Sequence, residues 1–116
     1  MKAFIYCGFL AVLMTGCAVS GSIQKTSDGK SGFDGAVYSG QKTAINTPTS
    51  KTQYRVFNQG ANSFVSVQAN LEEAEARAER YCQQKQLKYR IISETISMPP
   101  HILGNFPRAE IEFECV

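Results

Sequence analysis

The chain of 116 residues has little net charge, a single histidine and no apolar run long enough to cross a membrane. Because His101 is the only histidine, a metal site built from several histidines is excluded. Twelve basic residues stand against ten acidic ones without forming a basic cluster, so nucleic acid is not an expected partner. The sequence contains neither a Gly-x-Ser-x-Gly turn nor a glycine-rich phosphate loop. These absences predict no metal, no cofactor and no enzymatic activity.

The most apolar stretch lies at the N-terminus. Lys2 precedes an uncharged run from Ala3 to Thr15. A helix needs about 20 apolar residues to span the hydrocarbon core, so this run is too short. A positive start, a short apolar core and small residues at the end are typical of an export signal.

The residues that close this signal are Met14, Thr15, Gly16 and Cys17. They resemble the lipobox of bacterial lipoproteins, with methionine where leucine is favoured. The resemblance implies cleavage before Cys17 and acylation of that cysteine by palmitate-type chains, which would anchor the protein in a membrane. Ala18 follows in place of the aspartate that retains such proteins at the inner membrane, so the resemblance implies the outer membrane, facing the periplasm. The alternative is an ordinary signal peptide cut near Ala18.

Composition divides the chain into three parts. Residues 1–16 are the signal peptide, and residues 17–52 form the lipidated N-terminus and a flexible tether. The tether is predicted because Ser, Thr, Gly, Lys and Gln dominate it and leave little apolar surface to bury. The alternative for residues 32–40, where Phe33, Val37 and Tyr38 interrupt this composition, is a short strand that adds to the folded domain, although their glycines disfavour it. Residues 53–116 form the folded domain, which is small and has a modest core.

The sequence of the folded domain predicts one helix between two pairs of strands. Short β-prone runs occupy residues 54–58 and 63–68, separated by a turn around Gly60 and Asn62. A helix then spans 71–86, with Asn70 as its N-cap and Glu73 completing a capping box. Strands follow over 88–97 and 108–116. We therefore expect an α+β domain in the order β-β-α-β-β, with the helix packed on an antiparallel sheet.

Two cysteines remain after the signal and the lipid site are set aside. Cys115 alternates with Ile111 and Phe113 on the last strand, and Cys82 lies on the apolar side of the helix. In an oxidising compartment this pair predicts a disulfide. The alternatives are two buried free thiols or, less favoured, a metal site, for which two cysteines lack further ligands.

The last strand also presents a row of carboxylates, which we call the glutamate stripe: Glu110, Glu112 and Glu114. Alternate residues of a strand share one face, so these side chains stand about 7 Å apart. The favoured interpretation is a solvated face paired in part with Lys88, Arg90 or Arg108. The alternatives are a docking site for a basic partner and, least favoured, a carboxylate pair for glycoside hydrolysis.

A second candidate contact is the loop that joins the last two strands. Its apolar residues are Met98, Ile102, Leu103 and Phe106. If exposed, they would form a small patch for a protein partner. His101 in the same loop is interpreted as a surface residue.

The sequence therefore predicts a non-catalytic, lipid-anchored protein of the cell envelope. It would act by protein–protein contact, as an accessory or assembly component of an envelope complex. The alternative is a module of the periplasm that binds a small ligand or the cell wall.

Overall fold

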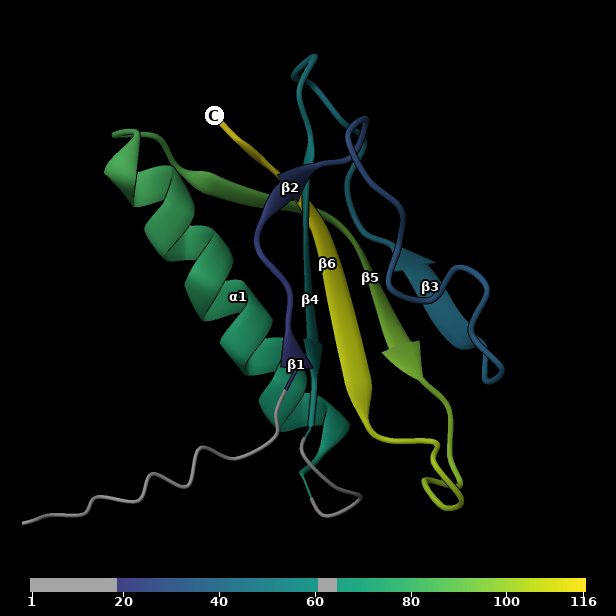
Figure 1. The fold of residues 1–116 in the computed structure, drawn as a ribbon. Coiled ribbons are helices and arrows are strands. Elements are labelled where there is room, and N and C mark those ends of the chain that lie inside the picture. The colour runs from purple at the N-terminus through teal and green to yellow at the C-terminus, as the bar shows by residue number, and fades with distance from the viewer. Residues whose placement is uncertain (1–18, 61–64) are drawn as a thin grey trace, which may run out of the picture.

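A computed structural model describes residues 19–60 and 65–116, which form one antiparallel sheet covered on one side by a helix (Figure 1). The elements, in chain order, are β1 (Val19–Ser20), β2 (Gln24–Lys25), β3 (Gly40–Ala44), β4 (Tyr54–Gln59), α1 (Val67–Gln84), β5 (Tyr89–Ser97) and β6 (Arg108–Cys115). The strand order is β1-β4-β6-β5-β3, and β2 pairs farther along β4. The expected α+β class, with a helix on an antiparallel sheet, is confirmed.

The helix begins earlier than the sequence predicts. Its N-cap is Ser66, whose Oγ accepts a hydrogen bond from the Ala69 backbone N–H at 3.0 Å. The predicted cap, Asn70, is instead a buried residue inside α1, and its amide donates to the Pro107 carbonyl at 3.2 Å. The strand predicted over 63–68 is wrong in its described part, because Val67 starts the helix. The centre of the predicted hairpin turn lies outside the described residues.

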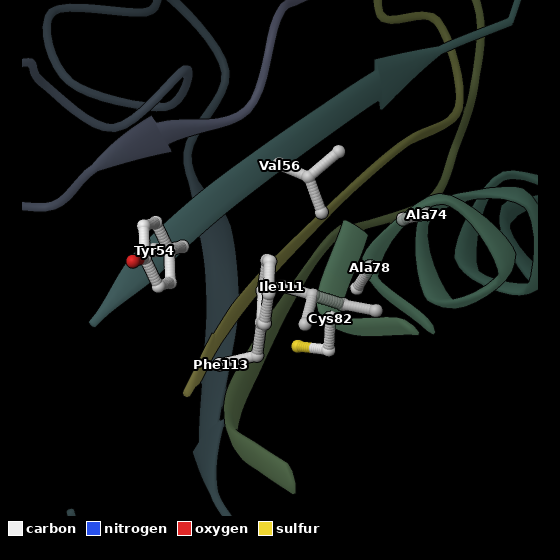
Figure 2. Close-up of a cluster of buried hydrophobic side chains, with 7 residues drawn as sticks. All are labelled: Tyr54, Val56, Ala74, Ala78, Cys82, Ile111 and Phe113. Carbon is white, nitrogen blue, oxygen red and sulfur yellow. The ribbon is translucent and has the colours of Figure 1, made fainter. Parts of the chain in front are cut away.

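Small residues let α1 lie close to the sheet. Ala74, Ala78 and Cys82 are fully buried against the central strands (Figure 2). The opposing side chains are large and apolar: Tyr54, Val56, Ile111 and Phe113. A small-residue face on the helix thus meets a large-residue face on the sheet, which is how a short domain reaches a close-packed interior.

The predicted disulfide is present. Cys82 and Cys115 are joined, with their Cα atoms 5.3 Å apart. The bond ties the C-terminal half of α1 to the end of β6, because both cysteines lie on the side of the sheet that the helix covers.

The N-terminal segment is not a free tether from Val19 onward. β1 and β2 pair with β4, and β3 pairs with the outer side of β5. Between them the Phe33 ring packs edge-on against Phe57, with centroids 5.8 Å apart. Composition did not reveal this, because the segment is held by backbone pairing, one aromatic residue and polar contacts rather than by apolar surface.

The register shows which residues of β1, β4, β6, β5 and β3 lie at the same end of the sheet. Val19 pairs with Gln59, and Gln59 pairs with Arg108. Ser97 lies beside Arg108 through hydrogen bonds and pairs with Gly40 on its other side. We call this the Val19 end of the sheet. The loop from β5 to β6 and the residues that lead into β3 both lie there (Figure 1).

Candidate functional site

The glutamate stripe lies on the face of the sheet opposite α1, and it is not solvated. Glu110 and Glu114 are buried, and Glu112 is half-buried. The groups that bind them belong mainly to the N-terminal segment of the same chain. The favoured prediction of a solvated face is therefore wrong, because alternation assigns residues to a face but does not show what covers it.

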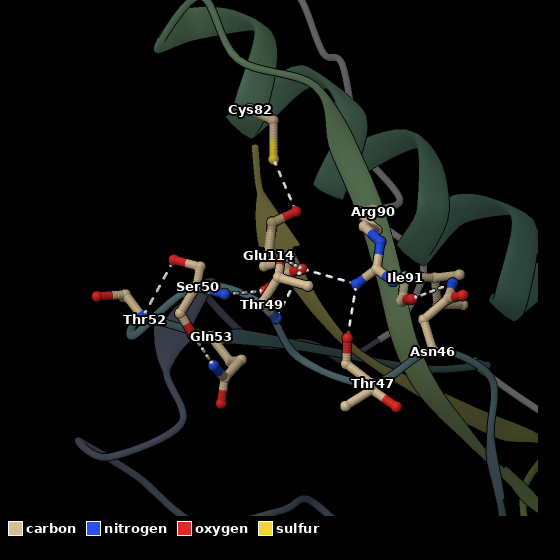
Figure 3. Close-up of polar contacts among 10 residues, drawn as sticks. All are labelled: Asn46, Thr47, Thr49, Ser50, Thr52, Gln53, Cys82, Arg90, Ile91 and Glu114. Atoms are coloured by element: carbon tan, nitrogen blue, oxygen red, sulfur yellow. Dashed lines mark hydrogen bonds and ion pairs between the residues drawn. The ribbon is translucent and has the colours of Figure 1, made fainter.

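Glu114 is the most enclosed of the three carboxylates, with no exposed surface. Figure 3 shows the polar groups that bind it. Its oxygens accept hydrogen bonds from the Thr49 N–H at 3.0 Å and from the Thr49 hydroxyl at 2.7 Å. They also accept from the Ser50 N–H and from the Arg90 guanidinium, both at 2.8 Å. Arg90 is one of the three predicted partners. A single carboxylate thus fastens residues 49–50 across the sheet.

The other two carboxylates bind separate parts of the segment. Glu110 accepts from the Ser31 hydroxyl at 2.6 Å and from the Gly32 N–H at 2.7 Å. Glu112 pairs with Lys42 at 3.3 Å and with Arg55 at 3.2 Å. The stripe therefore binds the N-terminal segment of its own chain.

Burial raises the pKa of these carboxylates and hydrogen bonding lowers it, and the balance differs among the three. Burial tends to raise the pKa of Glu114, but hydrogen bonds from Thr49, Ser50 and Arg90 outweigh it and lower the pKa to about 2. Burial also opposes ionisation of Glu112, and Lys42 and Arg55 reverse it, so its pKa is lowered. For Glu110 burial dominates, and its pKa is raised despite its hydrogen bonds.

Of the three glutamates, Glu110 most resembles a catalytic acid. A buried carboxylate that has a raised pKa and lies beside a hollow is a common feature of catalytic sites. The hollow measures about 310 Å³ and is also lined by Arg55 and Lys30. Both carboxylate oxygens, however, already accept hydrogen bonds from Ser31 and Gly32. These two hydrogen bonds hold the N-terminal segment in place on the sheet.

The β5–β6 loop is largely exposed, as its contact prediction requires. Leu103 is 87% exposed, Ile102 57% and Met98 42%, whereas Phe106 is half-buried. Val37, which was not among the predicted contact residues, is 93% exposed and lines a second hollow together with this loop. We call Val37, Tyr38, Met98, Ile102 and Leu103 the apolar patch.

The hollow within the apolar patch measures about 420 Å³. Two of the polar side chains that line it are hydrogen bonded within the protein: the Tyr38 hydroxyl donates to the Leu103 carbonyl at 2.9 Å, and the Asn105 amide donates to the Met98 and Pro100 carbonyls at 2.8 Å. His101 is within hydrogen-bond distance of Ser97, at 3.0 Å. These bonds fix the shape of the loop, so the patch presents chiefly apolar surface.

Arg108 joins the two segments that carry the patch. Its guanidinium donates to the Tyr38 carbonyl at 3.3 Å and to the Asn105 side-chain oxygen at 3.1 Å. It also stacks over the Phe33 ring, 4.7 Å from the centroid. Arg108 was one of the three partners predicted for the glutamate stripe, with Lys88 and Arg90. It binds backbone and amide oxygens instead.

β3 forms the other open feature of the surface. Within the described ranges it pairs only with β5, and Gln41, Lys42, Thr43 and Ala44 are all exposed. Its second edge therefore presents unpaired backbone groups, which are the groups that recruit another strand.

Among residues 19–60 and 65–116, no group of three His, Cys, Asp or Glu side chains is placed to hold a metal ion. In that same part of the chain, no helix combines the length and the apolar character that crossing a bilayer requires. Comparison with protein-family models, with curated proteins and with solved structures finds no match to this chain.

Proposed function

We propose that the protein is a non-catalytic, lipid-anchored component of the cell envelope that acts by contact with another protein. The observation that carries the proposal is the open edge of β3, a short strand whose side chains are exposed and whose outer backbone groups have no partner among the described residues. Partner proteins commonly recognise such an edge by adding a strand to it.

The charge on β3 is compatible with this role. Edge strands often carry a lysine that deters another strand from pairing. Lys42 occupies that position, but its ammonium group pairs with Glu112 of the same molecule at 3.3 Å. The pairing offsets the charge that a partner strand would otherwise meet.

A second candidate function is the binding of a small ligand or of cell-wall material. The hollow of about 420 Å³ in the apolar patch supports it, since ligand sites are commonly of this size. Its weakness is that Tyr38 and Asn105, which could orient a ligand there, are already hydrogen bonded within the loop.

Photo-crosslinking in intact cells tests the proposal. A benzophenone side chain at Thr43 places the reactive group on β3, and one at Glu79, on the exposed side of α1, is the matched control. We expect a discrete protein adduct from position 43 and none of that size from position 79. Adducts containing only lipid or cell-wall fragments would refute the contact role and favour a module that binds a small ligand or the cell wall.

The anchor is tested separately. Replacement of Cys17 by serine is expected to abolish metabolic labelling with palmitate. Persistent labelling of that variant would refute the assignment of Cys17 as the lipidated residue.

A further inference from the structure

We infer that the apolar patch rests on the bilayer to which the protein is anchored, with its exposed side chains inserted at the lipid surface. The inference rests on the proposed lipidation of Cys17. It goes beyond the proposed function by assigning a lipid surface, rather than a protein partner, to the β5–β6 loop.

The distance between the anchor and the fold is the first argument. β1 begins at Val19, which is two residues after Cys17. Two residues span at most about 7 Å in any conformation. The expected tether of residues 17–52 would have let the domain move far from the bilayer. Because Val19 already pairs with Gln59, the domain must instead sit directly on the membrane.

The direction in which the domain faces the membrane is the second argument. The anchor enters at the Val19 end of the sheet, and the register places Gly40, Ser97 and Arg108 at that same end. The apolar patch comes from the two segments next to those residues, 37–38 and 98–103 (Figure 1). Neighbouring strands are about 4.8 Å apart, so the four steps from β1 to β3 separate anchor and patch by roughly 20 Å across the sheet.

The distribution of exposed apolar side chains is the third argument. In the described part of the chain, five of the eight large exposed apolar residues belong to the patch. The other three, Ile45, Leu87 and Val116, are separated from it and lie toward the other end of the strands. If this side of the domain inserts into the bilayer, exposed apolar side chains are expected to be concentrated there.

The chemistry of the patch fits a lipid interface. Residues 98–107 and 35–41 contain no lysine, arginine, aspartate or glutamate. Leu103, Ile102 and Val37 supply apolar side chains, and Tyr38 supplies an amphipathic ring of the kind that sits at the headgroup level. Neutral apolar loops of this kind need no anionic lipid, in agreement with the low charge of the chain.

Fluorescence quenching in proteoliposomes tests the inference, because the chain has no tryptophan and a single introduced one is the only such reporter. The full lipidated protein carries Leu103→Trp, and Leu87→Trp, which replaces an exposed leucine outside the patch, is the matched control. The vesicles contain phosphatidylethanolamine and phosphatidylglycerol, with or without bromine on the acyl chains.

We expect brominated lipid to reduce emission from position 103 about twofold and to leave position 87 unchanged, because only a ring within the acyl boundary meets the quencher. Val37→Trp should behave as Leu103→Trp does, and it serves as the second reporter if one variant folds poorly. Equal, unquenched emission from positions 37, 103 and 87 in lipidated protein would overturn the inference.

The other occupants of the patch are distinguished by crosslinking from Leu103. A protein adduct, whether with an envelope protein or with a second copy of this chain, would overturn the lipid assignment while leaving the contact role at β3 intact. Failure of palmitate labelling at Cys17, by contrast, would remove the anchor and with it this inference, while the contact role at β3 would still be decided by crosslinking from Thr43.

Discussion

Replacing Glu114 by glutamine tests whether the glutamate stripe holds the N-terminal segment on the sheet. The carboxylate is buried and accepts hydrogen bonds on both oxygens, from Thr49 and Ser50 on one and from Thr49 and Arg90 on the other. Glutamine keeps one oxygen and turns an NH₂ group toward donors that have just lost their acceptor. It also leaves the Arg90 guanidinium without its counter-ion.

The expected loss follows from these contacts. A hydrogen bond to a charged group contributes about 1.5–3 kcal/mol, and a broken buried ion pair costs about 3–5 kcal/mol. Arg90 is partly exposed and still donates to the Thr47 carbonyl, which reduces the penalty for stranding its charge. We therefore expect Glu114→Gln to lower the free energy of unfolding by about 3 kcal/mol at neutral pH.

Urea denaturation with the disulfide intact measures this difference, and Glu110→Gln is the matched control. Both residues are buried glutamates of β6, but burial raises the pKa of Glu110 whereas hydrogen bonding lowers that of Glu114. Glutamine at position 110 loses one of two accepted hydrogen bonds and the ion pair with Arg55 at 3.7 Å, but it also removes a charge that burial disfavours. We therefore expect Glu110→Gln to lower the free energy of unfolding by about 1.5 kcal/mol, roughly half the loss for Glu114→Gln. Equal losses for the two variants, or a loss under about 0.5 kcal/mol for Glu114→Gln, would refute the reasoning.

The pH dependence supplies an independent check. The pKa of Glu114 is about 2 in the fold and 4.5 ordinarily, so its ionisation stabilises the folded state above pH 4.5. That stabilisation is lost as the pH falls from 4.5 toward 2. The unfolding free energies of the wild type and of Glu114→Gln should therefore converge across this interval. A constant difference down to pH 2 would exclude the carboxylate as its source.

Three further substitutions test other parts of the fold by denaturation. Replacing both Cys82 and Cys115 by alanine should lower stability by about 4 kcal/mol, because the bond closes a loop across a sequence separation of 33; an unchanged midpoint would contradict this. Gly40→Ala should destabilise by about 1–3 kcal/mol, since the added carbon would meet a β5 carbonyl oxygen at 2.9 Å, whereas Gly21→Ala, with 4.0 Å available, is a neutral control. Ser66→Ala should cost about 1 kcal/mol through loss of the helix cap, and no change would restore the start predicted at residue 71.

The sequence predicted those parts of the fold in which the buried residues recur at one regular spacing. Ile111, Phe113 and Cys115 alternate strictly, which set the face of β6 and directed Cys115 toward Cys82. The helix face of Ala74, Ala78 and Cys82 was equally regular. The start of α1 was missed, because Val65 and Val67 favour a strand locally and the hydroxyl of Ser66 outweighs that preference.

The candidate site was predicted only in part, for a related reason. The positions of the glutamates were evident, but their partners come from residues 31–50, whose polar composition is typical of a free chain. Two signals pointed the other way: Phe33 within that polar segment, and the arginines at positions 55 and 90. These arginines stand across from Glu112 and Glu114 in the register. Only the pairing of strands distant in sequence brings those signals together.

The position of β6 has a consequence for the order in which the protein can fold. β6 follows the other described strands in the chain, yet within the sheet it alone joins the β1–β4 pair to the β3–β5 pair. A chain that is still emerging can form each outer pair and pack α1 against β4 and β5, but its sheet stays divided and Cys82 lacks Cys115. The carboxylates that fasten residues 31–50 also arrive with β6. Assembly of the sheet, oxidation of the cysteines and closure of the N-terminal segment thus all wait for the same eight residues, Arg108–Cys115.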